Sequence, residues 1–329
     1  MKDSAQTAKP QNHFIFDPLT GDATIIAVNR AKRPDQTGSV GRKDSVSRTP
    51  VSSIVKDSAE APKPKPCPFC KGNESMTPAT LYQDEDDWNV RVFENKFPLL
   101  ENHEVVVHSP DHDKDIEDLS TDEVVKILRA YLNRLGIYNA EEKEVIIFNN
   151  RGGKAGASLM HPHSQVVASK GFPGTIEQEK SSALHYYNSH VMCYWCHEME
   201  KEIVNKQRVV LESKHFVVYV PEACRWSYEM RLLPKKHTPT FAYTTEPELY
   251  DLADVLQKVL KAYNHLFDRP DRNFWIHTER YEPYHWHIGF IPHIKVFGAL
   301  ELGAGIWVSD KATSEDAAAQ LRDVIATFK

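Results

Sequence analysis

Three features are missing from this 329-residue sequence, and each absence narrows what the protein can be. No stretch of about eighteen consecutive apolar residues occurs, so the sequence predicts no membrane-spanning helix and no membrane partner. The polar start, Met1–Gln6, precedes no apolar run, which predicts no signal peptide and a cytoplasmic protein. A basic surplus is also missing: 40 basic and 46 acidic residues give a net charge of −6. This charge argues against a nucleic-acid partner and leaves room for a small phosphorylated substrate.

Cysteine is scarce as well. The five cysteines of a cytoplasmic protein are expected to be thiols or metal ligands rather than disulfides. Four of them form two CxxC pairs, and Cys224 is predicted to be an inert thiol. Large apolar residues are rare at 35–66, where Ser, Lys, Asp and Pro dominate, and this composition predicts a mobile loop. The chain length allows one large domain or two of ordinary size.

The CxxC pairs reveal an internal repeat. From the second cysteine of each pair to a first histidine there are 42 and 41 positions, and from that histidine to a second there are 49 and 48. The residues that define these intervals are Cys70, His112 and His161 in the first half and Cys196, His237 and His285 in the second.

The same order of secondary structure is predicted within each repeat. Ser120 with Glu123, and Thr245 with Glu248, form capping boxes that open amphipathic helices. A strand-like apolar run follows each helix, and a second run follows a His-x-His motif. The sequence therefore predicts a duplicated α+β unit.

Each repeat offers the ligands of one tetrahedral zinc site. A CxxC pair places two thiolates on one turn, and two later imidazoles complete a Cys2His2 shell. Because a filled shell leaves no open position, both sites are predicted to be structural. The predicted ligands are Cys67, Cys70, His112 and His161 for the first site, and Cys193, Cys196, His237 and His285 for the second.

Three other interpretations of the CxxC pairs stay open. Cys193, Cys196 and His197 match the c-type haem attachment signature, although that chemistry needs export. Either pair could be a redox dithiol, although neither lies in a clear βαβ context. These cysteines and histidines could also be core residues without a metal, more readily at the second site than at the first.

The segment Ser158–Gln165 carries residues suited to phosphoryl transfer. In an extended chain, alternation places His161 and His163 on the same side, so that one can face a metal and the other a cleft. A neutral imidazole attacks phosphorus well when its remote ring nitrogen donates a hydrogen bond to a fixed acceptor. Gln165 and Ser158 can donate hydrogen bonds to the phosphoryl oxygens, where charge must be stabilised.

Arg30 and Arg33 offer bidentate phosphate contacts and belong to the first of several motifs that resemble one family. The other motifs are residues 16–20 and 93–98, CPFC at 67–70, SPDH at 109–112, FNNRG at 148–152 and HPHSQ at 161–165. Over residues 16–165, and through the duplication over nearly the whole chain, the sequence resembles the galactose-1-phosphate uridylyltransferase family of the histidine-triad superfamily.

This resemblance implies an α+β fold with two tandem histidine-triad-like domains, each an antiparallel sheet with packed helices. It implies a catalytic domain at 1–175, a degenerate domain at 176–329, a homodimer with composite active sites, and a ping-pong exchange through a nucleotidyl-histidine. The first predicted metal site matches the structural site of the family. By position, the resemblance assigns the nucleophile to His163, phosphoryl contacts to Gln165 and Ser158 with Asn150 nearby, phosphate binding to Arg30 and Arg33, and a place along the nucleoside to Asn95.

The second half departs from the catalytic pattern. His287 stands at the place of the nucleophile, but Gly289 stands where the first half has Gln165. Without that donor we expect no chemistry there, and a role in folding, dimerisation and sugar contacts instead. Lys295 and Glu301 match the sugar-binding region of the family.

Two features near that region leave the nucleotide and the sugar open. Leu300 replaces an aromatic residue that family members often carry, and the run 303–305 resembles the related ADP-glucose phosphorylases. The first hypothesis is transfer of UMP from a UDP-hexose to a hexose 1-phosphate through nucleotidyl-His163. The second is an ADP-sugar phosphorylase that uses the same histidine. A histidine-triad hydrolase is a third, which Gln165 disfavours because hydrolases carry a third histidine there, and a non-catalytic nucleotide-binding protein is the least favoured.

Overall fold

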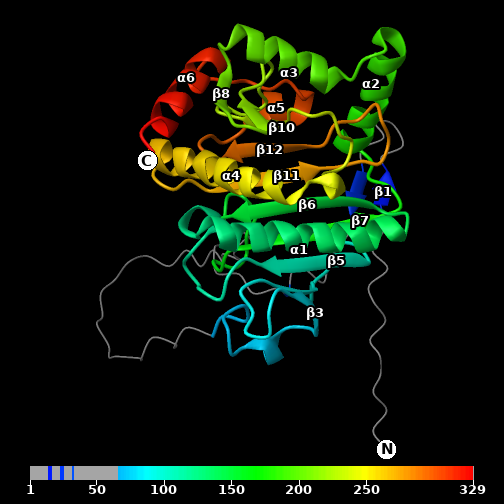
Figure 1. Ribbon diagram of the computed structural model, residues 1–329, viewed down its shortest axis with the longest axis vertical. Helices are drawn as coiled ribbons and strands as arrows, with labels where there is room; N and C mark the ends of the chain where they lie inside the picture. The colour runs from blue at the N-terminus through cyan, green and yellow to red at the C-terminus, as the bar shows by residue number, and fades with distance from the viewer. Residues whose placement is uncertain (1–13, 17–22, 26–31, 33–65, 329) are drawn as a thin grey trace, which may run out of the picture.

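The computed structural model describes residues 14–16, 23–25, 32 and 66–328 (Figure 1). Arg30, Arg33 and the predicted mobile loop at 35–66, apart from Pro66, lie outside these residues. In the described part of the chain, no helix combines the length and the apolar character needed to cross a lipid bilayer.

Among the described residues, ten antiparallel strands form one continuous sheet. Two further strands, β1 (Phe14–Phe16) and β2 (Ala23–Ile25), pair only with each other. In spatial order the strands of the large sheet are β3 (Thr80–Gln83), β4 (Arg91–Glu94), β5 (Asn102–Val107), β7 (His163–Ser169), β6 (Glu144–Arg151), β11 (Arg272–His277), β12 (His287–Pro292), β10 (Met230–Pro234), β9 (Phe216–Tyr219) and β8 (Val209–Glu212).

Helices and short 3-10 turns connect these strands. The helices are α1 (Thr121–Ala140), α2 (Thr175–His190), α3 (Tyr194–Asn205), α4 (Glu246–Phe267), α5 (Ala299–Ala304) and α6 (Ser314–Ile325), and the 3-10 turns are η2 (Glu74–Met76), η3 (Ile116–Asp118) and η4 (Phe241–Tyr243).

The strand order reflects the duplication that the sequence predicts. Read inward from its two edges, the sheet runs β3-β4-β5-β7-β6 on one side and β8-β9-β10-β12-β11 on the other. Each first-half strand therefore has a counterpart at the mirrored place, and α1 corresponds to α4. The mixed architecture confirms the α+β prediction.

The two halves meet strand to strand instead of keeping separate sheets. β6 pairs with β11 in the register Asn149↔Phe274, so the sheets expected for two tandem units join into one. The physical reason is that each half alone would expose the backbone groups of a long edge strand, and mutual pairing satisfies them. On the same face of the sheet α1 and α4 lie side by side (Figure 1) and share one apolar core.

Both predicted capping boxes are present. The Ser120 backbone N–H donates to Glu123 Oε2 at 2.7 Å, and the Thr245 backbone N–H donates to Glu248 Oε2, also at 2.7 Å. These contacts satisfy backbone donors that the first helical turn leaves unpaired, which fixes where α1 and α4 begin.

Alternation along β7 decides which side chains reach the functional face. Ser164 points toward α1, where the Tyr131 hydroxyl donates to it at 2.6 Å. His163 lies on the opposite face, where its ring centroid is 5.2 Å from that of Phe69 on the first CxxC turn. The site therefore forms on the face of the sheet that α1 and α4 leave uncovered.

Candidate active site and metal centres

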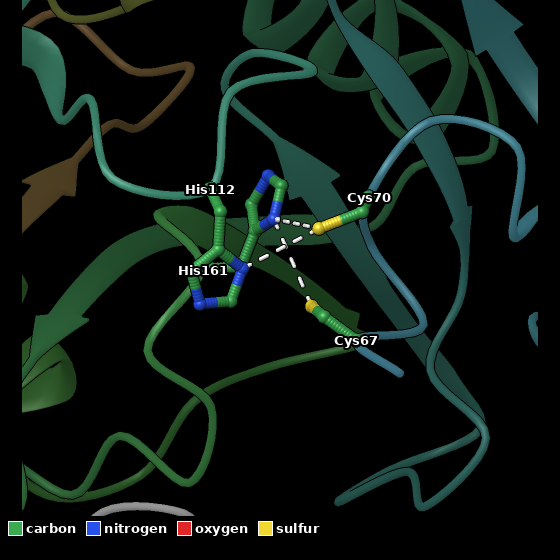
Figure 2. Close-up of side chains that lie close together, drawn as sticks. All are labelled: Cys67, Cys70, His112 and His161. Atoms are coloured by element: carbon green, nitrogen blue, oxygen red, sulfur yellow. Dashed lines mark hydrogen bonds between the residues drawn. The ribbon is translucent and has the colours of Figure 1, made fainter. Parts of the chain in front are cut away.

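The first predicted ligand set comes together at one point (Figure 2). Its ligand atoms, from Cys67, Cys70, His112 and His161, all lie within 4.8 Å of one another. Sγ of Cys70 is 3.4 Å from Nδ1 of His112 and 3.6 Å from Nδ1 of His161. Two thiols and two imidazoles are a typical donor set for structural zinc, so the residues fit that ion.

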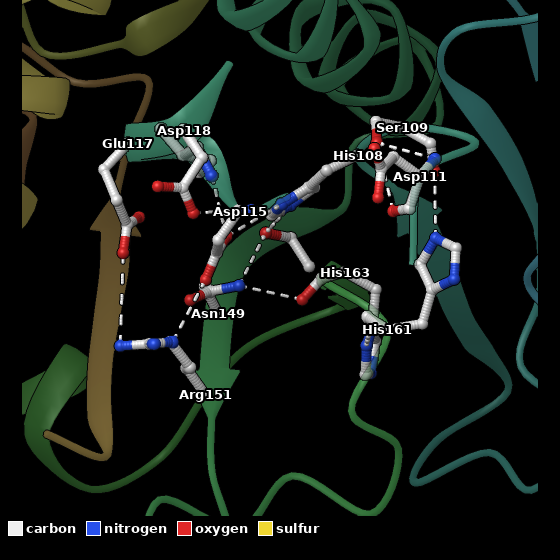
Figure 3. Close-up of polar contacts among 12 residues, drawn as sticks. His108, Ser109, Asp111, Asp115, Glu117, Asp118, Asn149, Arg151, His161 and His163 are labelled. Atoms are coloured by element: carbon white, nitrogen blue, oxygen red, sulfur yellow. Dashed lines mark hydrogen bonds and ion pairs between the residues drawn. The ribbon is translucent and has the colours of Figure 1, made fainter. Parts of the chain in front are cut away.

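The protonation of this cluster also suits a metal. Nε2–H of His161 donates to the Ser109 carbonyl at 2.9 Å (Figure 3), which leaves Nδ1 with a lone pair directed at the thiols. Burial lowers the pKa of His161 to about 4, so the ring is neutral. Burial and the neighbouring thiol raise the pKa of Cys70 to about 11, so a bound cation would have to displace its proton.

The second ligand set assembles in the same way. Its ligand atoms also lie within 4.8 Å of one another, with Sγ of Cys196 at 3.3 Å from Nδ1 of His237 and 3.4 Å from Nδ1 of His285. Nε2–H of His285 donates to the Pro234 carbonyl at 3.0 Å, which repeats the His161–Ser109 contact of the first half. The members are Cys193, Cys196, His237 and His285.

A third group that could hold a metal was not predicted from the sequence. Ligand atoms of Glu179, His277 and His287 lie within 4.8 Å of one another, and Glu179 Oε2 accepts from Nδ1–H of His277 at 2.8 Å. Burial raises the pKa of Glu179, but the two histidines lower it more, to about 2. Glu179 lies on α2, which precedes the second CxxC pair, and the stretch that precedes the first pair, 33–65, lies outside the described residues. The repeat spacing is counted from the CxxC pairs onward, so it gave no signal for this group.

His163 has the geometry of an activated nucleophile. Its Nδ1 lies 2.8 Å from the His161 carbonyl, and because a carbonyl only accepts, Nδ1 carries the proton and the lone pair is on Nε2. The side chain is 8 % exposed, and burial lowers its pKa to about 4. The imidazole is therefore neutral near pH 7 and can attack through Nε2.

Gln165 is oriented by a histidine that sequence reasoning missed. The Leu99 backbone N–H donates to Nδ1 of His103 at 2.8 Å, so the neutral His103 ring carries its proton on Nε2. That Nε2–H donates to Oε1 of Gln165 at 2.8 Å. Because Oε1 is engaged, the amide N–H of Gln165 is the group that can reach a substrate oxygen. The sequence gave no clear signal for His103, because 102–107 has three polar residues followed by three valines and therefore lacks the apolar-polar alternation of a half-buried strand.

Three further predicted residues lie on strands and loops of the first half. Asn95 follows β4, and its Oδ1 accepts from the Phe97 backbone N–H at 2.9 Å. Asn150 lies near the end of β6, and its Oδ1 accepts from Nδ2 of Asn273 at 2.7 Å. Ser158 is half-buried in the loop between β6 and β7, five positions before His163.

The predicted sugar-binding pair forms a contact within the second half. Nζ of Lys295 donates to Oε1 of Glu301 at 3.0 Å and to the Val308 carbonyl at 2.7 Å. Oε2 of Glu301 accepts from the Gly298 backbone N–H at 3.0 Å. The structure therefore places Lys295 and Glu301 beside each other at α5.

The second half repeats the local geometry of His163 at His287 but fills the space around that ring. Nδ1–H of His287 donates to the His285 carbonyl at 3.0 Å, as in the first half. Glu179 Oε2 lies 3.8 Å from Nε2 of His287, the ring nitrogen that corresponds to Nε2 of His163. At Gly289, the counterpart of Gln165, an added Cβ would lie only 2.6 Å from the Trp275 ring. The indole therefore occupies the room that a glutamine side chain would need.

Two family models match adjacent parts of the chain. Residues 51–172 match the N-terminal domain of a family described as a domain of unknown function, DUF4931. Residues 169–326 match the C-terminal domain of galactose-1-phosphate uridyl transferase. The two matches meet at residues 169–172, between the end of β7 and the start of α2.

Similar proteins cover between about four fifths and nearly all of the chain. An ADP-glucose phosphorylase from Arabidopsis thaliana is 28 % identical, with 99 % of this chain and 96 % of that protein covered. A galactose-1-phosphate uridylyltransferase from Thermotoga maritima is 25 % identical, with 94 % and 97 % covered. A solved structure of a galt-like protein from Arabidopsis thaliana is 30 % identical, has a TM-score of 0.72, and covers 79 % of this chain and 92 % of its own.

Proposed function

The chain belongs to the galactose-1-phosphate uridylyltransferase family, and from this premise we propose that it moves UMP from a UDP-hexose to a hexose 1-phosphate through nucleotidyl-His163. The observation that carries the proposal is the hydrogen bond from Nδ1 of His163 to the His161 carbonyl, because it leaves the Nε2 lone pair for attack on phosphorus.

The reaction proceeds in two displacements. In the first, Nε2 of His163 forms a bond to the phosphorus of the UMP group, and the bond from that phosphorus to the oxygen of the sugar 1-phosphate breaks. In the second, a phosphate oxygen of the incoming hexose 1-phosphate bonds to the same phosphorus, and the N–P bond breaks. Each step returns the electron pair to its leaving group, so the cycle needs no oxidant or further reactant.

Gln165 stabilises the negative charge that develops on the transferred group. His103 holds Oε1 of Gln165, so the Gln165 amide N–H points to the substrate and donates to a phosphoryl oxygen. Ser158 donates to the same group, and Asn150 lies alongside. Arg30 and Arg33, which lie outside the described residues, are proposed to bind the phosphates.

Binding of the two ends of the nucleotide sugar is divided between distant segments. We assign the nucleoside to the segment around Asn95 and the sugar hydroxyls to Glu301 with Lys295. In a homodimer with composite sites, Glu301 and Lys295 of one subunit would bind the sugar of the substrate that reacts at the other subunit's nucleophile. Size-exclusion chromatography with light scattering tests this arrangement: a monomer at working concentration would contradict it.

Both Cys2His2 clusters are proposed to hold structural zinc. When bound, the ion neutralises the thiolates and fixes the CxxC turn. Phe69 on the first turn then holds its ring against His163. The second half is proposed to perform no transfer. Glu179 lies against Nε2 of His287, and the Trp275 ring fills the space that a glutamine at position 289 would need. Reduced thiols and a nucleotide-sugar substrate agree with a cytoplasmic location.

A second candidate function is discharge of an AMP-histidine onto inorganic phosphate. The supporting observation is the ADP-glucose phosphorylase relative, which aligns with 99 % of this chain. The two functions share His163 and differ in the nucleotide and in the acceptor.

One experiment separates them. The protein is incubated with UDP-glucose or with ADP-glucose, quenched in mild alkali, and examined by intact mass spectrometry. We expect a uridylyl adduct that is lost in His163→Ala while UDP-glucose still binds. An adenylyl adduct instead would move the assignment to the phosphorylase reaction. If both nucleotide sugars bound without an adduct, the covalent mechanism would be wrong.

A further inference from the structure

A buried polar chain links the backbone of His163 to the second half, and Figure 3 shows its first contact, between Asn149 and His163. Nδ2 of Asn149 donates to the His163 carbonyl at 2.8 Å, and Oδ1 of Asn149 accepts from Nη1 of Arg272 at 3.1 Å. Arg272 is fully buried and Asn149 is 2 % exposed, so water does not compete for these contacts. Arg272 opens β11, which belongs to the half of the chain that lacks the catalytic pattern.

The strand register shows why Asn149 matters at this point. The pairing of β6 with β7 ends at Asn149↔Ser164, one residue after His163. Beyond that last backbone pair, the side chain of Asn149 adds a hydrogen bond between the two strands, from Nδ2 to the His163 carbonyl. The imidazole of His163 is attached to the same residue, so a shift of this peptide would move Nε2.

Two carboxylates fix the orientation of Arg272. Nη2 donates to Oδ2 of Asp115 at 2.8 Å and to Oε2 of Glu117 at 2.6 Å. Arg151 adds a second cation, with Nε at 3.5 Å from Oδ2 of Asp115. Two arginines thus face two carboxylates, and the planar guanidinium of Arg272 is held with one edge free for Asn149.

From these contacts we infer that Arg272, acting through Asn149, is a positioning residue for the His163 nucleophile. The inference rests on the proposed function, because it presumes that His163 attacks phosphorus. It gives the second half a role in the reaction, because Arg272 on β11 fixes the position of the nucleophile in the first half. The role is that of a fixed support, since Arg272 reaches no substrate.

A hydrolase-like alternative in the same region does not hold. Asp115, His108 and Ser164 follow one another in the order of a serine-hydrolase triad, with His108 Nε2 at 2.8 Å from the Ser164 hydroxyl. Oδ1 of Asp115 is 3.6 Å from Nδ1 of His108, and Ser164 is fully buried and accepts a hydrogen bond from Tyr131. No acyl substrate can reach that hydroxyl, so these groups support β7 from behind.

The test compares Asn149→Leu, Arg272→Lys and their double variant in the full chain. Arg272→Lys keeps the charge beside Asp115 and Glu117 but cannot bridge to Asn149 as well. A matched control is Arg134→Lys, which alters a buried arginine paired with Glu104 at 2.6 Å. The readouts are the single-turnover rate of nucleotidyl-His163 formation from UDP-glucose, the Kd for UDP-glucose, and the melting temperature.

We expect Asn149→Leu to lower the single-turnover rate by about 10- to 100-fold while Kd stays within about twofold, because misplacement of a reacting atom by about 1 Å can cost this much. Arg272→Lys should lower the rate in the wild-type background and add nothing in the Asn149→Leu background, since it acts through that residue. The control should lose thermal stability and keep its rate. Additive rate effects, or a wild-type rate in Asn149→Leu, would overturn the inference.

A readout without substrate separates this inference from the proposed function. Crystal structures of the wild type and of Asn149→Leu, or of Asn149→Ser should the leucine variant fail to fold, report the place of the His163 ring directly. A displaced or disordered ring supports the positioning role even if the wild type forms no adduct, which would refute only the transfer reaction. An unmoved ring overturns the positioning role whatever the activity.

Discussion

At the scale of single residues, two hydrogen bonds decide the chemistry that His163 and Gln165 can perform. The His161 carbonyl fixes the proton of His163 on Nδ1, and His103 takes up the acceptor of the Gln165 amide. Neither contact involves a substrate, so both side chains are already set before a nucleotide arrives. Such preorganisation lowers the cost of reaching the transition state.

His103→Leu is expected to lower the rate of adduct formation by about 10- to 100-fold, because the Gln165 amide can then rotate and present the wrong atom. His103→Gln should recover part of the rate, since its amide N–H can still donate to Gln165. Rapid-quench measurements on both variants test this. Equal rates for the leucine and glutamine variants would show that His103 acts only through packing.

The pH dependence follows from the burial of His163. Its pKa is lowered to about 4, so we expect the rate of adduct formation to stay level from pH 8 down to about pH 5 and to fall below that, as protonation removes the Nε2 lone pair. Single turnovers quenched in alkali would show this, with circular dichroism to confirm that the protein is folded at each pH. A midpoint near the ordinary histidine value of 6.5 would mean that the ring is more hydrated than the structure indicates.

At the scale of elements, the first CxxC turn connects the proposed metal site to His163, the proposed nucleophile. Phe69 sits between Cys67 and Cys70, and its ring packs against His163 at an angle of 71°. The corresponding residue of the second turn, Trp195, packs against His287 with ring centroids 5.3 Å apart. Both halves therefore have an aromatic residue of the CxxC turn packed against the second histidine of the His-x-His motif. Only the first half has a glutamine, Gln165, two positions after that histidine; the second has Gly289.

Cys70→Ser and Cys196→Ser form a matched pair for this link. Each should lose one equivalent of zinc and lower the melting temperature, because a structural metal contributes to folding free energy. We expect only Cys70→Ser to reduce the rate of adduct formation by more than about tenfold, since only the first turn holds Phe69 against the nucleophile. Metal analysis, thermal unfolding and single turnovers measure the three effects. A similar rate loss in both variants would show that the metals stabilise the molecule as a whole.

At the scale of the whole molecule, the sheet and the core run through both halves. β6 pairs with β11, and α1 packs against α4, so the central strands of each half are completed by the other. Gln257 of α4 also donates to the carbonyls of Ile116 and Leu119 at 3.0 and 2.6 Å. A sequence repeat of this kind does not by itself make two independent folding units.

Residues 1–172 alone are therefore expected not to fold. The fragment would expose the edge of β6, lose the α4 side of its core and leave Asp115 and Glu117 without Arg272. An uncompensated buried charge typically costs about 3–5 kcal/mol, a large share of the stability of a domain. Circular dichroism and proton NMR of the fragment test this expectation, which a dispersed, cooperatively melting spectrum would contradict.

The sequence by itself determined the features that depend on local spacing. The duplication, the helix starts at Ser120 and Thr245, the α+β class and the two Cys2His2 sets follow from intervals and from capping chemistry, which need few long-range contacts. The family resemblance added the roles of His163 and Gln165, which stay predictions until the variants are measured.

Only the tertiary structure decided how the halves combine. Nothing in the spacing of Arg272 and Asn149, 123 positions apart, indicates that they touch, because their contact depends on the β6–β11 register. The cluster of Glu179, His277 and His287, and the packing of Trp275 against Gly289, likewise depend on how elements distant in the sequence meet in the fold. Side chains that meet across strands from different halves are selected by the packing of the whole sheet, and a linear pattern does not encode that packing.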